Sequence, residues 1–429
     1  MAPRQHVLIF PAGSEIGLEI YHSLKYSHHL EVYGASGKSD HASLIYPADH
    51  YIEDERLYVD QHDFIERLNG YIDQHQIELI YPTHDTIANF LASQQAKIHA
   101  KIVTSCAETN HIARFKKETY LHFKSYDFCP AVYDPDSMTM PFPVFLKPND
   151  GQGGKGTFCA KNREELAFYL KQSPDLLVTE FLPGEELSVD CFTDFTGALR
   201  FVGPRTRERV QMGISFRSTA REATEEIMRI AEAINHAVKL DGAWFFQVKL
   251  DCQGRYKLLE FAPRQSSTMG LYRHAGINFA LLSFFNAKKM PVEILKNEGF
   301  LQLDRCLHNR FKSSLDYSTV YVDLDETLIA DGRVHEKVMA FLYQCKNAAI
   351  SIVLITKHRG DLNQTLEGHG IARSLFSDIL HLSDEQDKWA HINPMSSIFI
   401  DNYWFDRKQV KEKLGIPVFD VDAVECLLK

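Results

Sequence analysis

Short apolar runs alternate with amphipathic segments in the N-terminal part of the chain, and this alternation restricts it to one class of fold. The runs are HVLIF (6–10), LEVYGAS (30–36) and IELIYPT (77–83), and the segments between them have helical spacing. Buried strands that alternate with amphipathic helices are typical of βαβ units in a parallel sheet. We therefore predict an α/β lobe with a parallel sheet over residues 1–110.

The pattern changes twice in the rest of the sequence. Residues 111–290 combine helical segments with strand pairs such as AWFFQVKLD and KLLEFAP, which predicts an α+β unit. Residues 291–316 mix charges with short apolar pieces, so we expect a connector there. Strand–helix alternation restarts in residues 317–429 and predicts a second, smaller doubly wound domain. A length of 429 residues suits this multidomain organisation.

Composition and charge exclude several classes of function. A net charge of −10 argues against broad nucleic-acid binding. The sequence has neither an apolar stretch of about 18 residues nor a secretion signal at its N-terminus. The eight cysteines are scattered and contain no CxxC pair, which is typical of reduced thiols. We expect a soluble cytoplasmic protein without a membrane or nucleic-acid partner.

A glycine-rich stretch, KPNDGQGGKGT (147–157), follows a strand-like segment in the middle unit. Glycines such as Gly153 and Gly154 let backbone N–H groups approach phosphate oxygens, and Lys147 supplies positive charge. The spacing does not match the P-loop pattern GxxxxGK[ST], so the stretch alone also fits a hairpin turn.

Downstream residues favour the nucleotide-binding interpretation. Gln247 and Glu260 lie on two predicted strands joined by a turn, so an amide and a carboxylate oxygen can share one face and ligate Mg²⁺. The stretch GPRTRERVQ is rich in arginine. Its Arg205 and Arg207, together with the later Arg217, either bind an anionic substrate or form a solvated hairpin face.

With these motifs, residues 1–290 resemble the ATP-grasp superfamily, and most closely its carbamoyl-phosphate-synthase-like and carboxylate–amine ligase members. The resemblance implies a Rossmann-like N-terminal lobe without a nucleotide site of its own, followed by an ATP-grasp domain. It also implies roles for individual residues. The ATP-phosphate lysines are Lys116 and Lys147, the adenine hinge is Glu180, Phe181 and Leu182, the ribose acceptor is Glu186, the magnesium ligands are Gln247 and Glu260, and the arginine that steadies the acyl phosphate is Arg264.

Two positions depart from the pattern of that superfamily. Ala262 stands where an asparagine usually provides a ligand for a second metal, and Phe115 stands where an aspartate often precedes the first lysine. The site therefore either works with one well-held magnesium ion or has lost part of its chemistry.

The segment VYVDLDETL begins the last domain with two acids at the end of a strand. Asp323 and Asp325 are two residues apart, so they point to the same side, at the edge where open α/β sheets bind ligands. Thr356 and Asp401 also fall at strand ends, and Lys388 lies in a predicted helix start. A helix N-cap cluster would explain only one of the two acids.

This four-part pattern over residues 317–429 resembles the haloacid-dehalogenase-like (HAD) superfamily of aspartyl phosphotransferases. The resemblance implies that Asp323 is the nucleophile and Asp325 the general acid and base, and that Thr356 and Lys388 hold the phosphoryl group. Asp323, the carbonyl of Asp325 and Asp401 would hold Mg²⁺. The interval from Asp325 to Thr356 is too short for a large cap domain.

Together the resemblances imply a bifunctional enzyme, a ligase joined to a phosphatase. Its cofactors would be ATP and Mg²⁺, with Mn²⁺ as a substitute, and its partners a small carboxylate, a nucleophile and a phosphorylated metabolite. A homodimer is compatible with the sequence. One alternative is a phosphatase that carries a degenerate ATP-binding regulatory module, and another is a pair of sensor domains without catalysis.

Overall fold

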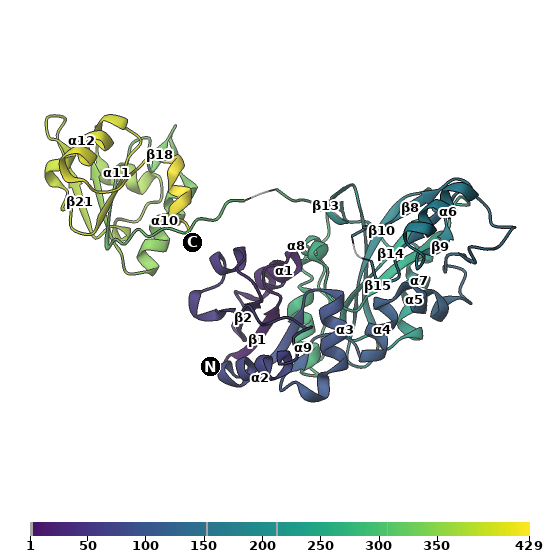
Figure 1. Ribbon diagram of the computed structural model, residues 1–429. Helices are drawn as coiled ribbons and strands as arrows, with labels where there is room; N and C mark the ends of the chain where they lie inside the picture. Colours follow the sequence, from purple (N-terminus) through teal and green to yellow (C-terminus); the bar gives the residue numbers. More distant parts are fainter. Residues whose placement is uncertain (1–2, 152, 212, 307) are drawn as a thin grey trace. The chain divides into compact units, whose positions relative to one another are not determined.

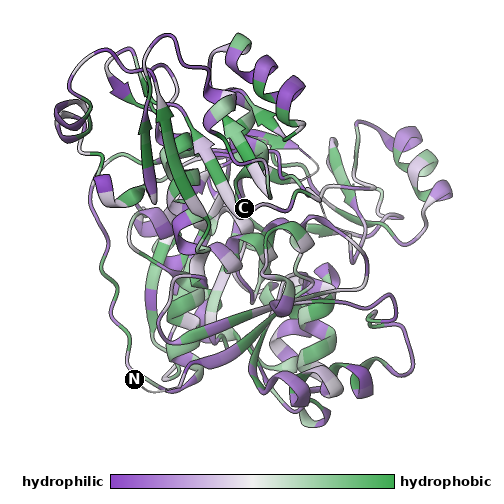
Figure 2. Cartoon of the chain, turned by 90° about the vertical axis from the view of Figure 1, so that its left-hand side faces the viewer, coloured by the Kyte–Doolittle hydropathy of each residue, from purple (hydrophilic) through white to green (hydrophobic). Residues whose placement is uncertain are grey.

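The computed structural model describes residues 3–151, 153–211, 213–306 and 308–429. The chain folds into two compact units, Met1–Leu307 and His308–Lys429 (Figure 1). Apolar strands, green in Figure 2, lie between helices whose polar residues are purple. None of the helices in the described ranges has the length and apolar character needed to cross a bilayer.

The first unit begins with the predicted parallel sheet. The strand order is β3-β2-β1-β4-β5, in which β1 is Gln5–Phe10, β2 Leu30–Ser36, β3 Tyr51–Glu53, β4 Ile77–Pro82 and β5 Lys101–Ile102. The connecting helices are α1 (Glu15–Leu24), α2 (Phe64–His75) and α3 (Asp85–Ser93). Successive residues of β1 enter two different apolar clusters, because side chains alternate across a sheet: Leu8 lies in one and Val7 in the other.

A helix from much later in the chain completes one of these clusters. Ala280 and Phe284 of α9 (Phe279–Ala287) pack with Val7 and Ile20. The hydroxyl of Tyr81, which lies on β4, donates to the carbonyl of Ala280 at 2.9 Å. The core of the N-terminal lobe therefore depends on residues far downstream in the sequence.

Two antiparallel sheets form the middle of the chain. The first has the order β6-β9-β7-β8, with β6 Val132–Tyr133, β7 Val144–Lys147, β8 Phe158–Ala160 and β9 Leu177–Glu180. The second has the order β11-β10-β14-β15, with β10 Glu186–Thr193, β11 Leu199–Thr206, β14 Gly242–Leu250 and β15 Tyr256–Ala262. The helices here are α4 (Ala107–Arg114), α5 (Lys116–Phe123), α6 (Arg163–Gln172) and α7 (Glu225–Ala237).

Helix α7 shows why the second sheet is stable. Its buried residues Ile227, Ile230 and Ile234 recur at helical spacing and pack on Trp244 and Val189 of the sheet. The side chain of Thr224 caps the helix by accepting from the N–H of Ile227 at 3.3 Å.

A third, small sheet lies in the first unit, with the order β12-β13-β16. Its strands are β12 (Arg209–Gln211), β13 (Ile214–Thr219) and β16 (Gln302–Asp304). Strand β16 falls inside the range 291–316 that we expected to be a connector. Its short alternating pattern of half-buried and exposed residues gave too weak a strand signal to be recognised.

The second unit is a parallel sheet with the order β21-β20-β17-β22-β23. The strands are β17 (Thr319–Val322), β20 (Ser351–Thr356), β21 (Asp378–His381), β22 (Ser397–Ile400) and β23 (Val418–Phe419). Helices α10 (Glu336–Asn347), α11 (Leu362–Gly368) and α12 (Trp404–Leu414) connect them, and a hairpin of β18 (Ile329–Ala330) and β19 (Arg333–Val334) follows β17. This is the doubly wound topology expected from the sequence.

Candidate active sites

The two predicted phosphate-binding lysines meet at the glycine-rich loop. Lys147 ends β7, is buried, and donates from Nζ to the hydroxyl of Tyr120. Lys116 begins α5 and donates from Nζ to the carbonyl of Gly151 at 2.8 Å. The same Nζ lies 3.8 Å from a carboxylate oxygen of Glu260.

The positive charge at this loop is only partly neutralised. Burial, and then the neighbouring Lys116, lower the pKa of Lys147 to about 7. In the described part of the chain no carboxylate lies within ion-pair distance of Lys147. Two lysines beneath glycines that expose backbone N–H groups fit the phosphate chain of ATP.

The expected adenine hinge lies where β9 ends. A carboxylate oxygen of Glu180 accepts from the N–H of Ala131 at 3.0 Å, while Leu182 is buried and Phe181 is more exposed. Glu186, the residue predicted to accept from the ribose of the nucleotide, begins β10, and its Oε1 lies 2.6 Å from Nε of Arg207. The strand ends thus hold Glu180 and Glu186 in defined positions.

The two expected magnesium ligands of the first unit face each other. Gln247 on β14 pairs with Glu260 on β15 in the strand register, whereas Ala262 is apolar and buried at the strand end. Among the described residues, no group of three or more His, Cys, Asp or Glu side chains is arranged to hold a metal ion. One amide and one carboxylate fit Mg²⁺ in the manner usual for nucleotide sites, where phosphate oxygens and water supply the other ligands.

Arg264 makes a contact that the sequence did not reveal. Its Nε and Nη2 donate to the carboxylate of Asp85 at 2.6 and 2.7 Å, and its guanidinium lies 5.2 Å from the ring centre of Phe245. Although burial alone would raise the pKa of Asp85, Arg264 holds it below its usual value. The arginine thus joins the end of β15 to the first residue of α3.

The three arginines considered for substrate binding are all paired with acids. Arg205 is buried and contacts Asp190 through Nε and Nη2 at 2.7 and 3.1 Å, Arg207 pairs with Glu186, and Arg217 pairs with Asp304 at the surface. Asp190 lies on β10, which pairs with β11, the strand that contains Arg205. The sequence could not distinguish this buried pair from a free cation, because the two residues are 15 positions apart.

In the second unit, the predicted acids, threonine and lysine converge at the carboxyl ends of three adjacent strands. Asp323 follows β17, Thr356 ends β20 and Asp401 follows β22. The Nζ of Lys388 donates to Asp323 at 2.8 Å and to Asp401 at 2.6 Å. All four side chains are buried.

The charges in this cluster are strongly coupled. Burial, followed by the proximity of Asp323, raises the pKa of Asp401 to about 7 although Lys388 opposes the shift. Burial also raises the pKa of Asp323 against the same lysine. Asp406 adds a third carboxylate 3.3 Å from the ammonium group. Two buried carboxylates that share a single lysine form a donor set that fits Mg²⁺.

Asp325 lies at the open side of this cluster. Its side chain is 52% exposed, and its Oδ1 lies 2.8 Å from Nδ1 of His358. The other ring nitrogen of His358 lies 2.9 Å from the hydroxyl of Thr365, and its backbone N–H donates to Thr356. The sequence pattern did not single out this histidine, although it follows Thr356 by only two residues.

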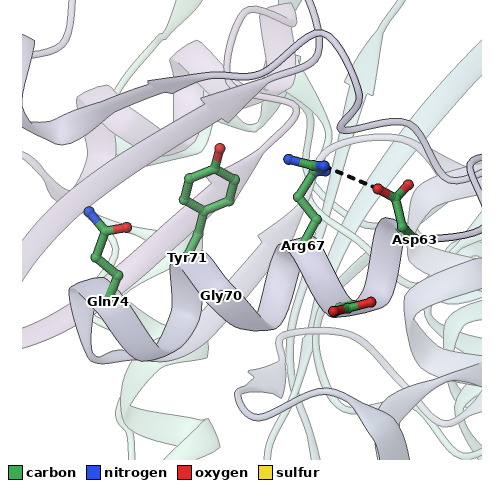
Figure 3. Close-up of a pocket in the computed structure, with 6 residues that line it drawn as sticks. Asp63, Arg67, Gly70, Tyr71 and Gln74 are labelled. Atoms are coloured by element: carbon green, nitrogen blue, oxygen red, sulfur yellow. Dashed lines mark hydrogen bonds and ion pairs between the residues drawn. The ribbon is translucent and has the colours of Figure 1, made fainter.

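A hollow elsewhere on the first unit contains none of the predicted site residues. It lies along α2, has a volume of about 390 Å³, and is lined by Asp63, Glu66, Arg67, Gly70, Tyr71 and Gln74 (Figure 3). Arg67 donates to Asp63 at 3.1 Å within the same helix. These side chains carry no arrangement that suits nucleotide or metal binding.

Comparison with known proteins finds relatives of the first unit. Residues 172–301 match a family described as "ATP-grasp in the biosynthetic pathway with Ter operon". None of the curated protein sequences matches this chain.

Several solved structures share the fold. The biotin carboxylase domain of 2-oxoglutarate carboxylase from Hydrogenobacter thermophilus, in complex with MgADP, ADP and bicarbonate, has a TM-score of 0.59 at 15% identity and covers 70% of this chain and 73% of its own. An L-amino acid ligase from Bacillus licheniformis has a TM-score of 0.54 at 16% identity, with coverages of 68% and 75%. N5-carboxyaminoimidazole synthetase from Staphylococcus aureus, complexed with ADP, has a TM-score of 0.55 at 14% identity, with coverages of 67% and 78%.

The likeness establishes a mixed α/β fold of the ATP-grasp type. Residues 308–429 are less than a third of the chain, so matches of this coverage lie mainly in the first unit.

Proposed function

We propose that the chain is a bifunctional enzyme with four parts: residues 1–110, 111–290, 291–316 and 317–429. The first unit would be a Mg-ATP-dependent carboxylate–amine ligase that works through an acyl phosphate. The second would be an HAD-type phosphohydrolase that works through an aspartyl phosphate. The ligase proposal rests on Lys147, which ends the strand before the glycine loop and has no carboxylate within ion-pair distance among the described residues, together with the ATP-grasp family match. The phosphatase proposal rests on the cluster around Lys388.

In the ligase half, the chain's own residues align two reactants and neutralise charge. Lys116 and Lys147 bind the ATP phosphates, Glu180 to Leu182 contact adenine, and Glu186 accepts from the ribose. A carboxylate oxygen of the substrate attacks the γ-phosphorus and releases ADP. The amine then attacks the acyl carbon and phosphate leaves. Magnesium, held by Gln247 and Glu260, would neutralise phosphate charge, and Arg264 would steady the acyl phosphate.

In the phosphatase half, Asp323 attacks phosphorus while the P–O bond to the leaving group breaks. Asp325 gives its proton to the leaving oxygen and then accepts a proton from the water that hydrolyses the aspartyl phosphate. Thr356 and Lys388 hold the phosphoryl oxygens. Magnesium bound by Asp323, Asp401 and the carbonyl of Asp325 would neutralise charge on the phosphoryl group.

The cofactors would be ATP and Mg²⁺, with Mn²⁺ as a substitute. The ligands would be a small carboxylate, a nucleophile and a phosphorylated metabolite, and a homodimer is compatible with these sites. The cysteines at positions 106, 129, 159, 191, 252, 345 and 426 are free thiols, which fits the reducing cytoplasm.

Product detection with two single-site variants tests the proposal. The protein is incubated with ATP, Mg²⁺ and pooled carboxylates and amines, and mass spectrometry follows ADP and coupled products. We expect ADP formation to be lost in Lys147→Ala and kept in Lys155→Ala, whose exposed side chain lies in the same loop. Hydrolysis of p-nitrophenyl phosphate should be lost in Asp323→Asn and kept in Asp331→Asn, at an exposed turn.

The second candidate is a phosphatase regulated by a degenerate nucleotide-binding module, and Ala262 is the observation that favours it. It predicts no ADP with any substrate pool, together with a phosphatase rate that ATP changes. Absence of both turnovers in the wild type would refute both enzymatic proposals and favour a pair of sensor domains.

A further inference from the structure

Arg305 occupies a fixed position immediately after β16. Its backbone N–H donates to the carbonyl of Phe216 on β13 at 2.9 Å, and its own carbonyl accepts from Nη2 of Arg209 at 2.9 Å. The backbone at this position is therefore an extension of the small β12-β13-β16 sheet. An arginine placed in this way has a defined direction.

Alternation along β16 determines that direction. Side chains at positions 301, 303 and 305 share one face of the strand, and those at 302 and 304 share the other. Asp304 is exposed and pairs with Arg209 and Arg217 on the outer face. Leu301 packs against the buried cluster that contains Tyr272, and α8 (Gly270–His274) contacts both β16 and α1. Figure 1 shows α8 beside α1. Arg305, which is half-buried, therefore faces the interior of the first unit.

The guanidinium of Arg305 has no hydrogen bond or ion pair within the described ranges. Burial lowers its pKa; the nearby Glu19 carboxylate, the largest of the charged influences, raises it, while Arg205 lowers it and Glu15 raises it slightly. Glu19 is already bound to Arg273 at 2.6 Å, so it does not neutralise Arg305 directly. A half-buried charge without an ion-pair partner destabilises the fold, because its lost hydration is not replaced.

Arg205 offers a second donor in the same region, because its backbone bridges Ala220, whose N–H donates to the carbonyl of Leu301 at 3.1 Å. It uses Nε and Nη2 for Asp190, and Nη2 also donates to the hydroxyl of Ser266 at 3.1 Å. The remaining nitrogen, Nη1, is buried and has no hydrogen-bond partner among the residues that the structure describes. A buried donor without an acceptor marks a position where an acceptor belongs. Ser266 follows Arg264 by two residues, so this region adjoins the proposed acyl-phosphate site in the chain.

We propose that Arg305 and Nη1 of Arg205 together bind the oxyanion of a small carboxylate or phosphate compound, with the hydroxyl of Ser266 beside it. Two guanidinium groups with donors left over repel each other unless an anion lies between them. Identifying this anion as part of the ligase substrate rests on the proposed function. The existence of the anion site does not.

Chemical labelling tests the site without any turnover. Phenylglyoxal modifies unpaired arginines, and peptide mass spectrometry of the full-length protein reports the rate at Arg305. We expect saturating acetate or methyl phosphate to slow that rate at least about fivefold, and potassium chloride of equal ionic strength to leave it unchanged. Labelling of Arg209, which is half exposed and paired with Asp304, is the internal control. The more protective anion identifies a carboxylate or a phosphate site, and no protection by either overturns the proposal.

A matched pair of variants tests the link to catalysis. Arg305→Gln should raise the KM of the anionic substrate roughly tenfold or more without changing the KM of ATP, because one charge-assisted contact is lost. Arg229→Gln, which removes an exposed arginine paired with Asp127 elsewhere in the first unit, should change neither. Anions should raise the Tm of the wild type but not of Arg305→Gln, whose fold is checked in the same melts.

The two proposals can fail separately. Protection of Arg305 without ADP formation would refute the ligase and leave the anion site. ADP formation with an unchanged substrate KM in Arg305→Gln would refute the anion site as a substrate site and leave the ligase.

Discussion

Lys147 is a buried lysine without a carboxylate within ion-pair distance among the described residues, and this makes the stability of the nucleotide-free protein depend on pH. Its pKa is lowered to about 7, from 10.5 in the unfolded chain. The unfolded state therefore binds more protons between these two values, so the unfolding free energy rises with pH across that window. Below pH 7 the folded protein bears the whole cost of the buried charge.

We therefore expect Lys147→Met to stabilise the nucleotide-free protein. The gain should be about 1–3 kcal/mol at pH 6 and should shrink as the pH rises toward 10. Urea unfolding across this pH range measures the effect. Lys155→Met, at an exposed position of the same loop, should show no such trend. ATP should raise the Tm of the wild type and of Lys155→Met, but not of Lys147→Met.

Whereas the buried charge of Lys147 destabilises the nucleotide-free protein, Lys388 stabilises the fold, because its ammonium group contacts two buried carboxylates. Lys388→Met leaves Asp323 and Asp401 facing each other and should cost about 3–5 kcal/mol at pH 8. With their pKa values raised, the folded state binds more protons than the unfolded state, so this cost falls as the pH drops toward 5. Added Mg²⁺ should restore part of the Tm.

Lys337→Met is the matched control for that variant, since Lys337 is exposed on α10 in the same unit. Its Tm should respond neither to pH nor to Mg²⁺ in this way. A Lys388→Met protein as stable as the wild type at pH 8 would contradict the assignment of the cluster.

At the scale of elements, the turn between β12 and β13 touches the glycine-rich loop. A methyl group on Gly213 would lie 2.2 Å from the Cα of Gly153, and the φ of Gly213 is +77°. Gly213→Ala therefore forces the two segments apart. We expect it to weaken ATP binding roughly tenfold, as measured by calorimetry, at a stability cost of about 1 kcal/mol.

Gly254 provides the control for this element. It lies in the turn between β14 and β15 with a φ of +75°, and a methyl group there would meet open space. Gly254→Ala should carry a similar stability cost and leave ATP affinity unchanged. Equal affinities in both variants would show that the hairpin does not support the loop.

The strength of the pattern in each helix and strand also determines how much of the fold and of the sites can be predicted from the sequence. Strong periodicities predicted both parallel sheets. They also placed Asp323, Thr356 and Asp401 at strand ends, and the structure has these three residues at one edge of the sheet, because carboxyl ends of parallel strands share one edge. Strand β16 is three residues long and escaped detection. With it, Arg305 was missed. Partners such as Asp190 for Arg205, or Asp85 for Arg264, depend on register and packing that spacing does not encode.

At the scale of the whole molecule, residues 308–316 are exposed, without helix or strand, and join the two units. Limited trypsin digestion should therefore cut first at Arg310 or Lys312 and release two stable fragments. Calorimetry should show two unfolding transitions, and only the one from the first unit should move when ATP is added. Early cleavage in the glycine loop, or a single transition that ATP shifts as a whole, would contradict this independence.

The packing of α9 against the N-terminal sheet affects how the protein emerges from the ribosome. The carbonyl of Ala280 accepts from Tyr81 across 199 positions of sequence, so the first lobe leaves the exit tunnel before the helix that completes this apolar cluster beside α1. At roughly 5–20 residues per second, synthesis must continue for about 10–40 s before the covering helix is available. During that interval, the apolar face around Val7 and Ile20 is a natural target for nascent-chain chaperones.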